Sequence, residues 1–363
     1  MELFAVSQPG IEEVTAEELK ELGIKGRIVP GGVEFSGGLE ELYRCNLWLR
    51  TATRVLVRFC QFKAKHFAEL VRKAKRCKWE NFLKPEISIR IRVTSKKSKL
   101  YHTKAIEERI LRSIEEAVGF SPKLSRFEDE GTSIVVRFER DICTISINSS
   151  GPPLYKRGYR VAETEAPLRE NLAAAMILLS GWKGEVPLID PFCGSGTIPI
   201  EAALLAANIP PGRKRKFAFM DWKNFDKELF RQILWEIKEK ERAVNSPILG
   251  FDIEEKAVKA SAENAKAAGV SNLVKFENLS FPPLSFKEGV VITNPPYGKR
   301  LSVRNIREIY RRLGEWVESQ FLSYKLLFLS PSENLARETG LNVRKITHFS
   351  NGGITVGLYR ADG

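Results

Sequence analysis

Residues 294–297 have the sequence Asn-Pro-Pro-Tyr, and these residue types suit the binding of an amine attached to an aromatic ring. The apolar run 290–293 predicts a β-strand that ends just before them. The side-chain oxygen of Asn294 and the carbonyl of Pro295 are acceptors on a backbone that two prolines make rigid. Together they could accept both N–H groups of the amine and direct the nitrogen lone pair at a methyl group. The catalytic candidates are therefore Asn294, Pro295, Pro296 and Tyr297; the alternative is a rigid turn.

Tyr297 could stack on a base that has been turned out of its helix, as enzymes that modify bases require. An amine on an aromatic ring is a poor nucleophile, because its lone pair is delocalised into the ring. Two acceptors held in place before the reaction would meet the partial positive charge that develops on the nitrogen. The pattern therefore predicts modification of an exocyclic amine.

A glycine-rich loop, Asp-Pro-Phe-Cys-Gly-Ser-Gly-Thr at residues 190–197, follows the strand predicted at 186–190. Glycines let a ligand approach the backbone closely, and ligands bind at the carboxyl ends of strands in open α/β sheets. The loop lacks the lysine of a phosphate-binding P-loop and the full Gly-x-Gly-x-x-Gly pattern. A carboxylate at Asp190 would hold a cationic or amine-bearing ligand instead. The alternative is a purely structural bend.

Asp252 ends the next apolar run, 248–252, and precedes a helix predicted from about 254 to 268. An acid at the tip of a second strand can accept both hydroxyls of a ribose. The same side chain could instead cap the helix N-terminus, and the two roles are compatible. We therefore predict a nucleoside-binding position at Asp252.

A basic and aromatic insertion separates the glycine loop from Asp252. Phe217, Phe219 and Trp222 follow four consecutive basic residues, and a helix is predicted from there to about residue 244. Such a mixture suits phosphate contacts and base stacking. The alternative is a solvated loop that a few buried aromatic side chains anchor. The basic candidates are Arg213, Lys214, Arg215 and Lys216.

The net charge of +13 is distributed unevenly over the 363 residues. Residues 44–104 contain 18 basic and 3 acidic side chains, whereas residues 1–43 contain 3 and 9, and residues 105–150 contain 6 and 9. A polyanionic partner explains this block; a solvated basic surface is the alternative. Further nucleic-acid candidates are Arg90 and Arg92 on an alternating strand at 87–93, Lys96, Lys97 and Lys99 after it, and Arg157 and Arg160 in a basic, aromatic segment.

Composition excludes several other classes of protein. No run of 18 apolar residues predicts a membrane span, and the first residues do not resemble a secretory signal. The three histidines and five scattered cysteines, without Cys-x-x-Cys spacing, predict neither a metal site nor a disulfide framework. We expect a cytoplasmic monomer with reduced thiols.

The elements that must position these side chains fall into two halves. Residues 1–62 predict a β-α-β-β-α-β order, which is typical of a ferredoxin-like unit, and a second α+β unit follows over 63–150. Residues 149–153 form a turn-rich linker. From 151 on, helices and strands alternate, which predicts an α/β domain with a parallel sheet. The expected fold class is α/β, with an α+β region before the α/β domain.

The glycine loop, Asp252 and the Asn-Pro-Pro-Tyr run together resemble the class I, Rossmann-like methyltransferases that act on amino groups. The resemblance implies that S-adenosylmethionine binds with its methionine part at the loop and its ribose at Asp252. Asn278 stands near the position where many such enzymes have an acid that contacts adenine. The implied cofactor-binding residues are Asp190, Pro191, Gly194, Ser195, Gly196, Thr197, Asp252, Ile253 and Asn278.

Three further segments resemble RNA guanine-N2 methyltransferases that carry a THUMP domain, an RNA-binding module. They are residues 156–171, 46–50 (Asn-Leu-Trp-Leu-Arg) and 95–103 (Ser-Lys-Lys-Ser-Lys-Leu-Tyr-His-Thr). The resemblance implies a ferredoxin-like unit at 1–62, a THUMP domain at 63–150 and a methyltransferase domain at 151–363. It also implies RNA as the partner, with the N2 amine of a guanosine in large-subunit (23S) ribosomal RNA as the slightly favoured target. The alternatives are a guanosine in the tRNA acceptor stem, adenine N6 in DNA, and a non-catalytic RNA-binding factor.

Overall fold

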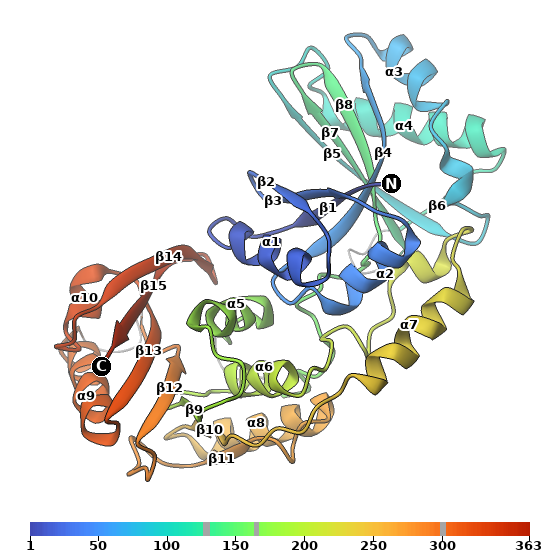
Figure 1. Ribbon diagram of the computed structural model, residues 1–363. Helices are drawn as coiled ribbons and strands as arrows, with labels where there is room; N and C mark the ends of the chain where they lie inside the picture. Colours follow the sequence, from blue (N-terminus) through green and yellow to red (C-terminus); the bar gives the residue numbers. More distant parts are fainter. Residues whose placement is uncertain (126–130, 163–166, 298–302) are drawn as a thin grey trace. The chain divides into compact units, whose positions relative to one another are not determined.

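The computed structural model describes residues 1–125, 131–162, 167–297 and 303–363 (Figure 1). These residues form two compact units. Unit 1 contains Met1–Ser7, Thr15–Leu154 and Arg215–Glu236, and unit 2 contains Gln8–Val14, Tyr155–Lys214 and Ile237–Gly363. Each unit therefore includes a segment that is distant from it in the sequence.

Unit 1 is built on one eight-stranded sheet with the order β2-β3-β1-β4-β8-β7-β5-β6. Its first half has the predicted β-α-β-β-α-β order, and Gly23, two residues after the end of α1, has the positive φ of +78° expected after a helix C-terminus. The elements are β1 (Glu2–Val6), α1 (Glu12–Glu21), β2 (Gly26–Val29), β3 (Gly32–Ser36), α2 (Leu39–Trp48) and β4 (Arg54–Lys63).

The second half of unit 1 extends the same sheet, because β8 pairs antiparallel with β4. Arg140 and Asp141 have φ values of +50° and +66°, as a two-residue turn between β7 and β8 requires. Helix α3 begins at Phe67 and ends at Ala74. The elements are α3 (Phe67–Ala74), the 3₁₀ turn η1 (Trp79–Asn81), β5 (Ser88–Lys96), α4 (Thr103–Val118), β6 (Lys123–Leu124), β7 (Thr132–Glu139) and β8 (Ile142–Asn148).

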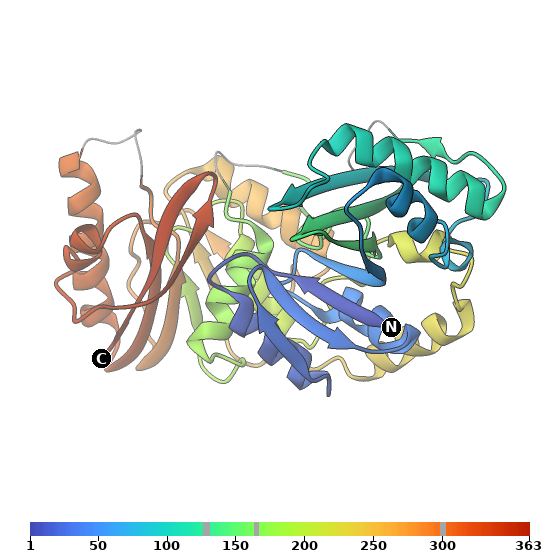
Figure 2. The same ribbon diagram turned by 90° about the horizontal axis from the view of Figure 1, so that it is seen from above.

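Strand β5 has the alternation that the sequence predicts. Ile89 and Ile91 are buried, and α4 packs against the strand with its own buried Ile106. Figure 2 shows α3 and α4 together on one face of β5, β7 and β8. Arg90 and Arg92 alternate with the buried isoleucines and are half-buried. They therefore lie on the opposite face of the sheet.

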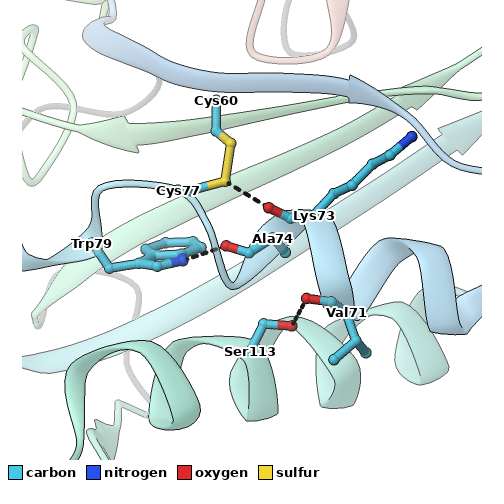
Figure 3. Close-up of a disulfide and its surroundings, with 7 residues drawn as sticks. All are labelled: Cys60, Val71, Lys73, Ala74, Cys77, Trp79 and Ser113. Atoms are coloured by element: carbon cyan, nitrogen blue, oxygen red, sulfur yellow. Dashed lines mark hydrogen bonds between the residues drawn. A yellow bond between two sulfur atoms is a disulfide. The ribbon is translucent and has the colours of Figure 1, made fainter.

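A disulfide joins Cys60 on β4 to Cys77, which follows α3 (Figure 3). The Cα atoms are 5.7 Å apart, within the normal range for a disulfide. Nearby, the Trp79 indole donates to the carbonyl of Ala74 at 2.8 Å. The prediction that all thiols are reduced is therefore wrong for this pair. Its 17-residue separation has no diagnostic spacing, so only the folded chain, in which the segment after α3 lies against β4, brings the two sulfurs together.

Unit 2 contains a seven-stranded sheet with the order β11-β10-β9-β12-β13-β15-β14. The first five strands in this order are parallel, as predicted, and β15 is antiparallel to both of its neighbours. The strands are β9 (Leu188–Asp190), β10 (Ile248–Phe251), β11 (Lys275–Glu277), β12 (Glu288–Thr293), β13 (Ser323–Ser330), β14 (Arg344–Asn351) and β15 (Ile354–Asp362).

Helices cover both faces of this sheet, and a buried apolar cluster lies under each layer. In Figure 1, α9 and α10 lie on one face and α5, α6 and α8 on the other. The short strands are almost wholly buried, as is typical of a parallel sheet. The helices are α5 (Glu170–Ser180), α6 (Thr197–Ala206), α8 (Glu255–Ala268), α9 (Val303–Gln320) and α10 (Glu333–Arg337).

The insertion between α6 and β10 folds largely as part of unit 1. It contains the 3₁₀ turn η2 (Ala218–Asp221) and α7 (Lys227–Glu239), which ends before residue 244. Phe217, Phe219 and Trp222 are buried. The Phe219 ring stacks on Tyr43 at a centroid distance of 4.6 Å, and Trp222 meets Phe82 edge-on at 5.0 Å. These rings are therefore core residues, which corrects the expectation that they stack on bases.

Among the residues that the structure describes, no helix is long and apolar enough to cross a membrane.

Candidate active site

The glycine loop connects β9 to α6 and has backbone angles that favour glycine. Gly194 and Gly196 have φ values of +53° and +81°. A Cβ atom on Gly196 would lie 2.7 Å from the Cβ of Ser261 and 3.0 Å from the Phe276 ring. The loop therefore requires glycine at position 196 for both its dihedral angles and its packing.

Asp252 follows β10 and lies next to this loop. Its carboxylate accepts hydrogen bonds from the backbone N–H groups of Gly194 and Glu254, each at 3.0 Å. The N-cap of α8 is Glu254, so Asp252 stands two residues before the cap and is not the cap residue that the sequence suggested. The Asn278 side chain donates to the Asp252 carbonyl at 2.9 Å. The carboxyl ends of β9, β10 and β11 thus carry one connected set of polar groups.

Two apolar side chains beside this set are unusually exposed. Ile253 has 72% of its surface accessible, and Leu279 has 44%. Each follows directly after one of the polar residues of the set, Asp252 or Asn278. Apolar surface next to a few polar groups is the usual composition of a small-molecule site. This end of the sheet therefore suits a ligand with a flat apolar ring and a polyhydroxyl group.

Asp190 lies at the end of β9 and is 1% exposed. Its Oδ1 accepts hydrogen bonds from the Thr293 hydroxyl at 2.7 Å and from the Phe192 N–H at 3.1 Å. Burial, and to a lesser degree the charge of Asp252, raises the pKa of Asp190 to about 7. Because Thr293 immediately precedes Asn294, this carboxyl connects the glycine loop to the Asn-Pro-Pro-Tyr segment.

The Asn-Pro-Pro-Tyr segment begins directly after β12. The Oδ1 atom of Asn294 is buried and has no hydrogen-bond partner among the described residues. An unsatisfied buried acceptor costs about 1–3 kcal/mol, so a donor from a bound molecule would be stabilised there. Tyr297 is half-buried, and its hydroxyl accepts a hydrogen bond from the Asn351 side chain at 2.8 Å. The segment thus presents one open acceptor beside a ring that is held in place.

Comparison with protein families matches three consecutive segments of the chain. Residues 2–56 match an RlmL ferredoxin-like domain, residues 64–148 match a THUMP domain, and residues 157–358 match an RMKL-like methyltransferase domain. The last match covers more than half of the chain. The chain belongs to the RMKL-like methyltransferase family.

Named relatives share most of this sequence. YpsC of Bacillus subtilis, provisionally named as an RNA methyltransferase, is 34% identical over 99% of this chain and 95% of its own length. The ribosomal RNA large subunit methyltransferase K/L of Methylococcus capsulatus is 33% identical over 99% of this chain, but the match spans only 51% of that protein. The solved structure of SMU.472, whose name as a methyltransferase is also provisional, is complexed with SAH. It is 32% identical to this chain, and the match covers 99% of this chain and 97% of that one with a TM-score of 0.88.

As in other RMKL-like methyltransferases, the cofactor is S-adenosylmethionine, and the described residues fit it. The buried Asp190 and the two glycines suit the amine-bearing methionine part, Asp252 suits the ribose, and Ile253 supplies exposed apolar surface for the adenine. When bound, the cofactor supplies an activated methyl group. No group of three or more histidine, cysteine, aspartate or glutamate side chains suited to a metal occurs in the part of the chain that the structure describes.

Two arginines that we expected to bind RNA support the interior of the RMKL-like domain instead. Arg157 is buried, and its guanidinium pairs with Glu201 at 3.4 Å. Arg160 donates to Ser195 Oγ at 2.9 Å and to Thr197 Oγ1 at 3.1 Å. The expectation for Arg157 is therefore wrong, because water and RNA cannot reach its side chain. Arg160 orients the two hydroxyl residues of the glycine loop.

The other basic candidates have different surroundings. Arg213 and Lys214 donate to the carbonyls of Ala268 and Ala267, at the C-terminus of α8, where cations are favoured. In unit 1, Arg215 donates to two backbone carbonyls of the 152–153 linker, and Lys216 pairs with Asp221 at 3.2 Å. The exposed candidates are Lys214 and Lys216 of this group, together with Lys96, Lys97 and Lys99 on unit 1.

Two asparagines of the site did not attract attention in the sequence. Asn264 of α8 is buried and donates to the Ser195 carbonyl at 3.0 Å, so it fixes the backbone of the glycine loop. Asn351, at the end of β14, holds Tyr297. Lone asparagines have no recognisable spacing. A signal for Asn351 could have come only from its place before Gly352 and Gly353, where a hairpin turn is expected.

Proposed function

We propose that this chain is an S-adenosylmethionine-dependent RNA methyltransferase that methylates the N2 amine of a guanosine, in 23S ribosomal RNA. The observation that carries the proposal is the buried Oδ1 of Asn294, which has no hydrogen-bond partner among the described residues. An amine N–H would satisfy this oxygen, and the Pro295 carbonyl is the second acceptor. Asn294, Pro295, Pro296 and Tyr297 are the proposed catalytic residues.

The residues of the site have separate tasks in this proposal. Asn294 and Pro295 accept the two N–H groups, which localises the nitrogen lone pair and orients it for attack. Tyr297 stacks on the guanine, and Asn351 keeps the ring in place. The nitrogen becomes acidic as it gains a methyl group, so its proton leaves to water and no strong base is needed. The proposed cofactor-binding residues are Asp190, Pro191, Gly194, Ser195, Gly196, Thr197, Asp252, Ile253 and Asn278.

Three observations support RNA as the substrate. Basic residues are concentrated at 44–104, a THUMP domain matches 64–148, and two relatives are named for RNA or ribosomal RNA. Amines of adenine and guanine both suit the Asn-Pro-Pro-Tyr geometry, so guanine N2 rests on the family resemblance. We also propose domain boundaries at 62 and 150, and a cytoplasmic monomer.

The decisive experiment maps the modified nucleosides of total RNA and DNA, by mass spectrometry, in strains with and without the gene. We expect N2-methylguanosine in 23S ribosomal RNA to disappear with the gene and to return with the wild-type copy. Loss of N2-methylguanosine from tRNA instead would replace the ribosomal target with the acceptor stem. Loss of N6-methyladenine from DNA alone would refute the RNA assignment.

Complementation with Asn294→Ala separates catalysis from simple RNA binding. If the chain were a non-catalytic assembly factor, this variant would restore the modification. We expect that it does not, although the protein accumulates at the wild-type level. A copy carrying Trp235→Ala, an exposed residue of α7, serves as the control and should restore the modification fully.

A further inference from the structure

The segment between β5 and α4 exposes an aromatic side chain among lysines. Tyr101 has 65% of its surface accessible, and the centroid of its ring lies 4.2 Å from the centroid of the His102 ring. Single exposed apolar side chains are common, but here four exposed lysines occur within the same nine residues, 96–104. We name residues 96–104 the lysine–tyrosine loop; its lysines are Lys96, Lys97, Lys99 and Lys104.

Hydrogen bonds hold the lysine–tyrosine loop in one conformation. The Ser95 hydroxyl donates to the carbonyl of Leu100 at 2.6 Å, and the Leu100 side chain is buried. The backbone N–H of Lys99 donates to Asp141 Oδ1 at 2.7 Å, and the N–H of Asp141 donates to Ser98 Oγ at 2.9 Å. The loop is thus fastened to the β7–β8 turn, and a bound molecule would meet a surface that is already ordered.

The lysines of this loop differ from several other basic side chains of the same block, which form ion pairs. Arg58 pairs with Glu34, Lys73 with Glu69 and Lys75 with Glu116. In contrast, none of the four loop lysines has an ion pair or a side-chain hydrogen bond within the described parts of the chain. The carboxylate of Asp141, which holds the loop, accepts its hydrogen bond from the backbone N–H of Lys99 and not from a lysine side chain. Four positive charges therefore remain available to an anionic partner.

We infer that the lysine–tyrosine loop binds an unpaired nucleotide of the RNA, with its base stacked on Tyr101 and its neighbouring phosphates contacted by the loop lysines. The inference rests on the proposed function, which supplies RNA as the partner. An aromatic ring on a protein surface stacks on a base that is free of its helix, because base pairs inside a duplex are enclosed between their neighbours. A surface of lysines alone would fit duplex and single strands equally.

The test measures the dissociation constants of the full-length protein by fluorescence anisotropy. The probes are a labelled RNA hairpin with a single-stranded 3′ extension and a blunt duplex with the same number of phosphates. The variants are Tyr101→Ala and Tyr101→Phe, which keeps the ring. Trp235→Ala is the matched control, because Trp235 is also 65% exposed and belongs to unit 1.

We expect Tyr101→Ala to weaken binding of the extended hairpin about 5- to 100-fold, the range for one lost base–aromatic stack. Tyr101→Phe and Trp235→Ala should leave binding within about twofold, and binding of the blunt duplex should change little in any variant. Equal affinity of wild-type protein and Tyr101→Ala for the hairpin would overturn the inference, as would equal losses on hairpin and duplex.

The result is separable from that of the proposed function. If the wild-type protein methylates RNA but Tyr101→Ala binds normally, the lysine–tyrosine loop is not the nucleotide site and the enzymatic proposal stands. If Tyr101 is required for binding the hairpin while no RNA is methylated, the loop assignment stands and the enzymatic proposal fails. Thermal unfolding of each variant excludes misfolding, because exposed side chains contribute little to stability.

Discussion

The carboxyl ends of the strands around the glycine loop in unit 2 and the lysine–tyrosine loop of unit 1 use polar residues in opposite ways. Around the glycine loop, polar side chains such as Asp190, Thr293 and Asn264 are buried, and named partners hold each of them. On the lysine–tyrosine loop the backbone is held, but the lysine side chains are exposed and unpaired among the described residues. Chemistry needs fixed geometry at one atom, whereas binding a flexible polyanion needs charge spread over several side chains.

The difference predicts how single substitutions act. When a buried group with one fixed partner is removed, its whole contribution to binding or catalysis is lost. An exposed lysine shares its task with its neighbours, so its loss is partial. The following predictions test this difference, from the largest expected effect to the smallest.

Asn294→Ala should lower kcat/KM for RNA methylation by about 100- to 1,000-fold, because a preorganised dipole toward the reacting amine is lost. Binding of RNA and of S-adenosylmethionine should stay within about threefold. The measurement combines single-turnover methylation with calorimetric titration of the cofactor. A loss carried by weaker RNA binding alone would contradict the proposed contact with the amine.

Gly196→Ala should weaken cofactor binding more than tenfold and lower the melting temperature, because the new Cβ would meet Ser261 and Phe276. The matched control is Gly181→Ala. Gly181 has a similar φ of +73°, but a Cβ there meets nothing within 4 Å. The control should show only the cost of the left-handed conformation, about 1–2 kcal/mol in the free energy of unfolding, with normal cofactor affinity. Equal cofactor affinities of the two variants would show that the close packing of the loop is unimportant.

Cofactor affinity should fall about tenfold between pH 8 and pH 6, because the pKa of Asp190 is raised to about 7 and its carboxyl is largely neutral at pH 6. A neutral carboxyl no longer attracts the cationic amine of the cofactor. In the cofactor-free protein, the same raised pKa means that the folded state holds this proton more tightly than the unfolded chain does. Asp190 therefore contributes most to the free energy of unfolding below about pH 4, and this contribution is lost as the pH rises through 7.

Asp190→Asn is the control for this pH dependence. Its cofactor affinity, measured by calorimetry, should be low and nearly constant over the same range of pH. A pH dependence that persists in the variant would assign the titration to another group.

Asn351→Ala should lower kcat by about three- to tenfold with little change in KM, an order expected for one lost neutral hydrogen bond. Burial raises the pKa of Tyr297, and the hydrogen bond from Asn351 opposes this increase. The variant should therefore show a still higher pKa for this tyrosine in an ultraviolet difference titration, and Tyr297→Phe identifies its signal. An unchanged titration would mean that Asn351 does not act through Tyr297.

Lys97→Ala should have the smallest effect, a two- to fivefold loss of RNA affinity at moderate salt. The slope of log affinity against log salt concentration should become shallower by about 0.7 to 1, the value for one lost phosphate contact. Anisotropy titrations at several salt concentrations measure both quantities. A loss as large as that of Asn294→Ala would break the distinction between fixed and distributed contacts.

Much of the fold and of the candidate site could be predicted because it depends on local patterns. Apolar runs that end in Asp190, Asp252 and Asn294 predict strands, and parallel strands place their carboxyl ends at one edge of a sheet. The structure confirms these strands, and it adds a hydrogen bond from the Gly194 N–H to Asp252 that the sequence did not predict. The alternation on β5 and the βαββαβ order were predictable for the same reason, since strand and helix periods are properties of neighbouring residues.

Other features depend on which segments pack together, and no local pattern contains that information. The aromatic residues of the insertion are buried because residues 215–236 fold with unit 1, although they lie within the methyltransferase half of the sequence. Arg157 and Arg160 have the composition of a basic surface, yet Glu201 and Glu170 are brought to them from 44 and 10 residues away.

The sequence by itself determined the methyltransferase family and predicted where its site lies, because the glycine loop, Asp252 and the Asn-Pro-Pro-Tyr segment each combine particular residue types with the end of a strand. Only the tertiary structure decided which basic and aromatic residues are free to meet RNA, which thiols pair, and that Asn351 holds Tyr297. Burial and partner choice depend on contacts between distant segments. Those contacts exist only after the chain has folded.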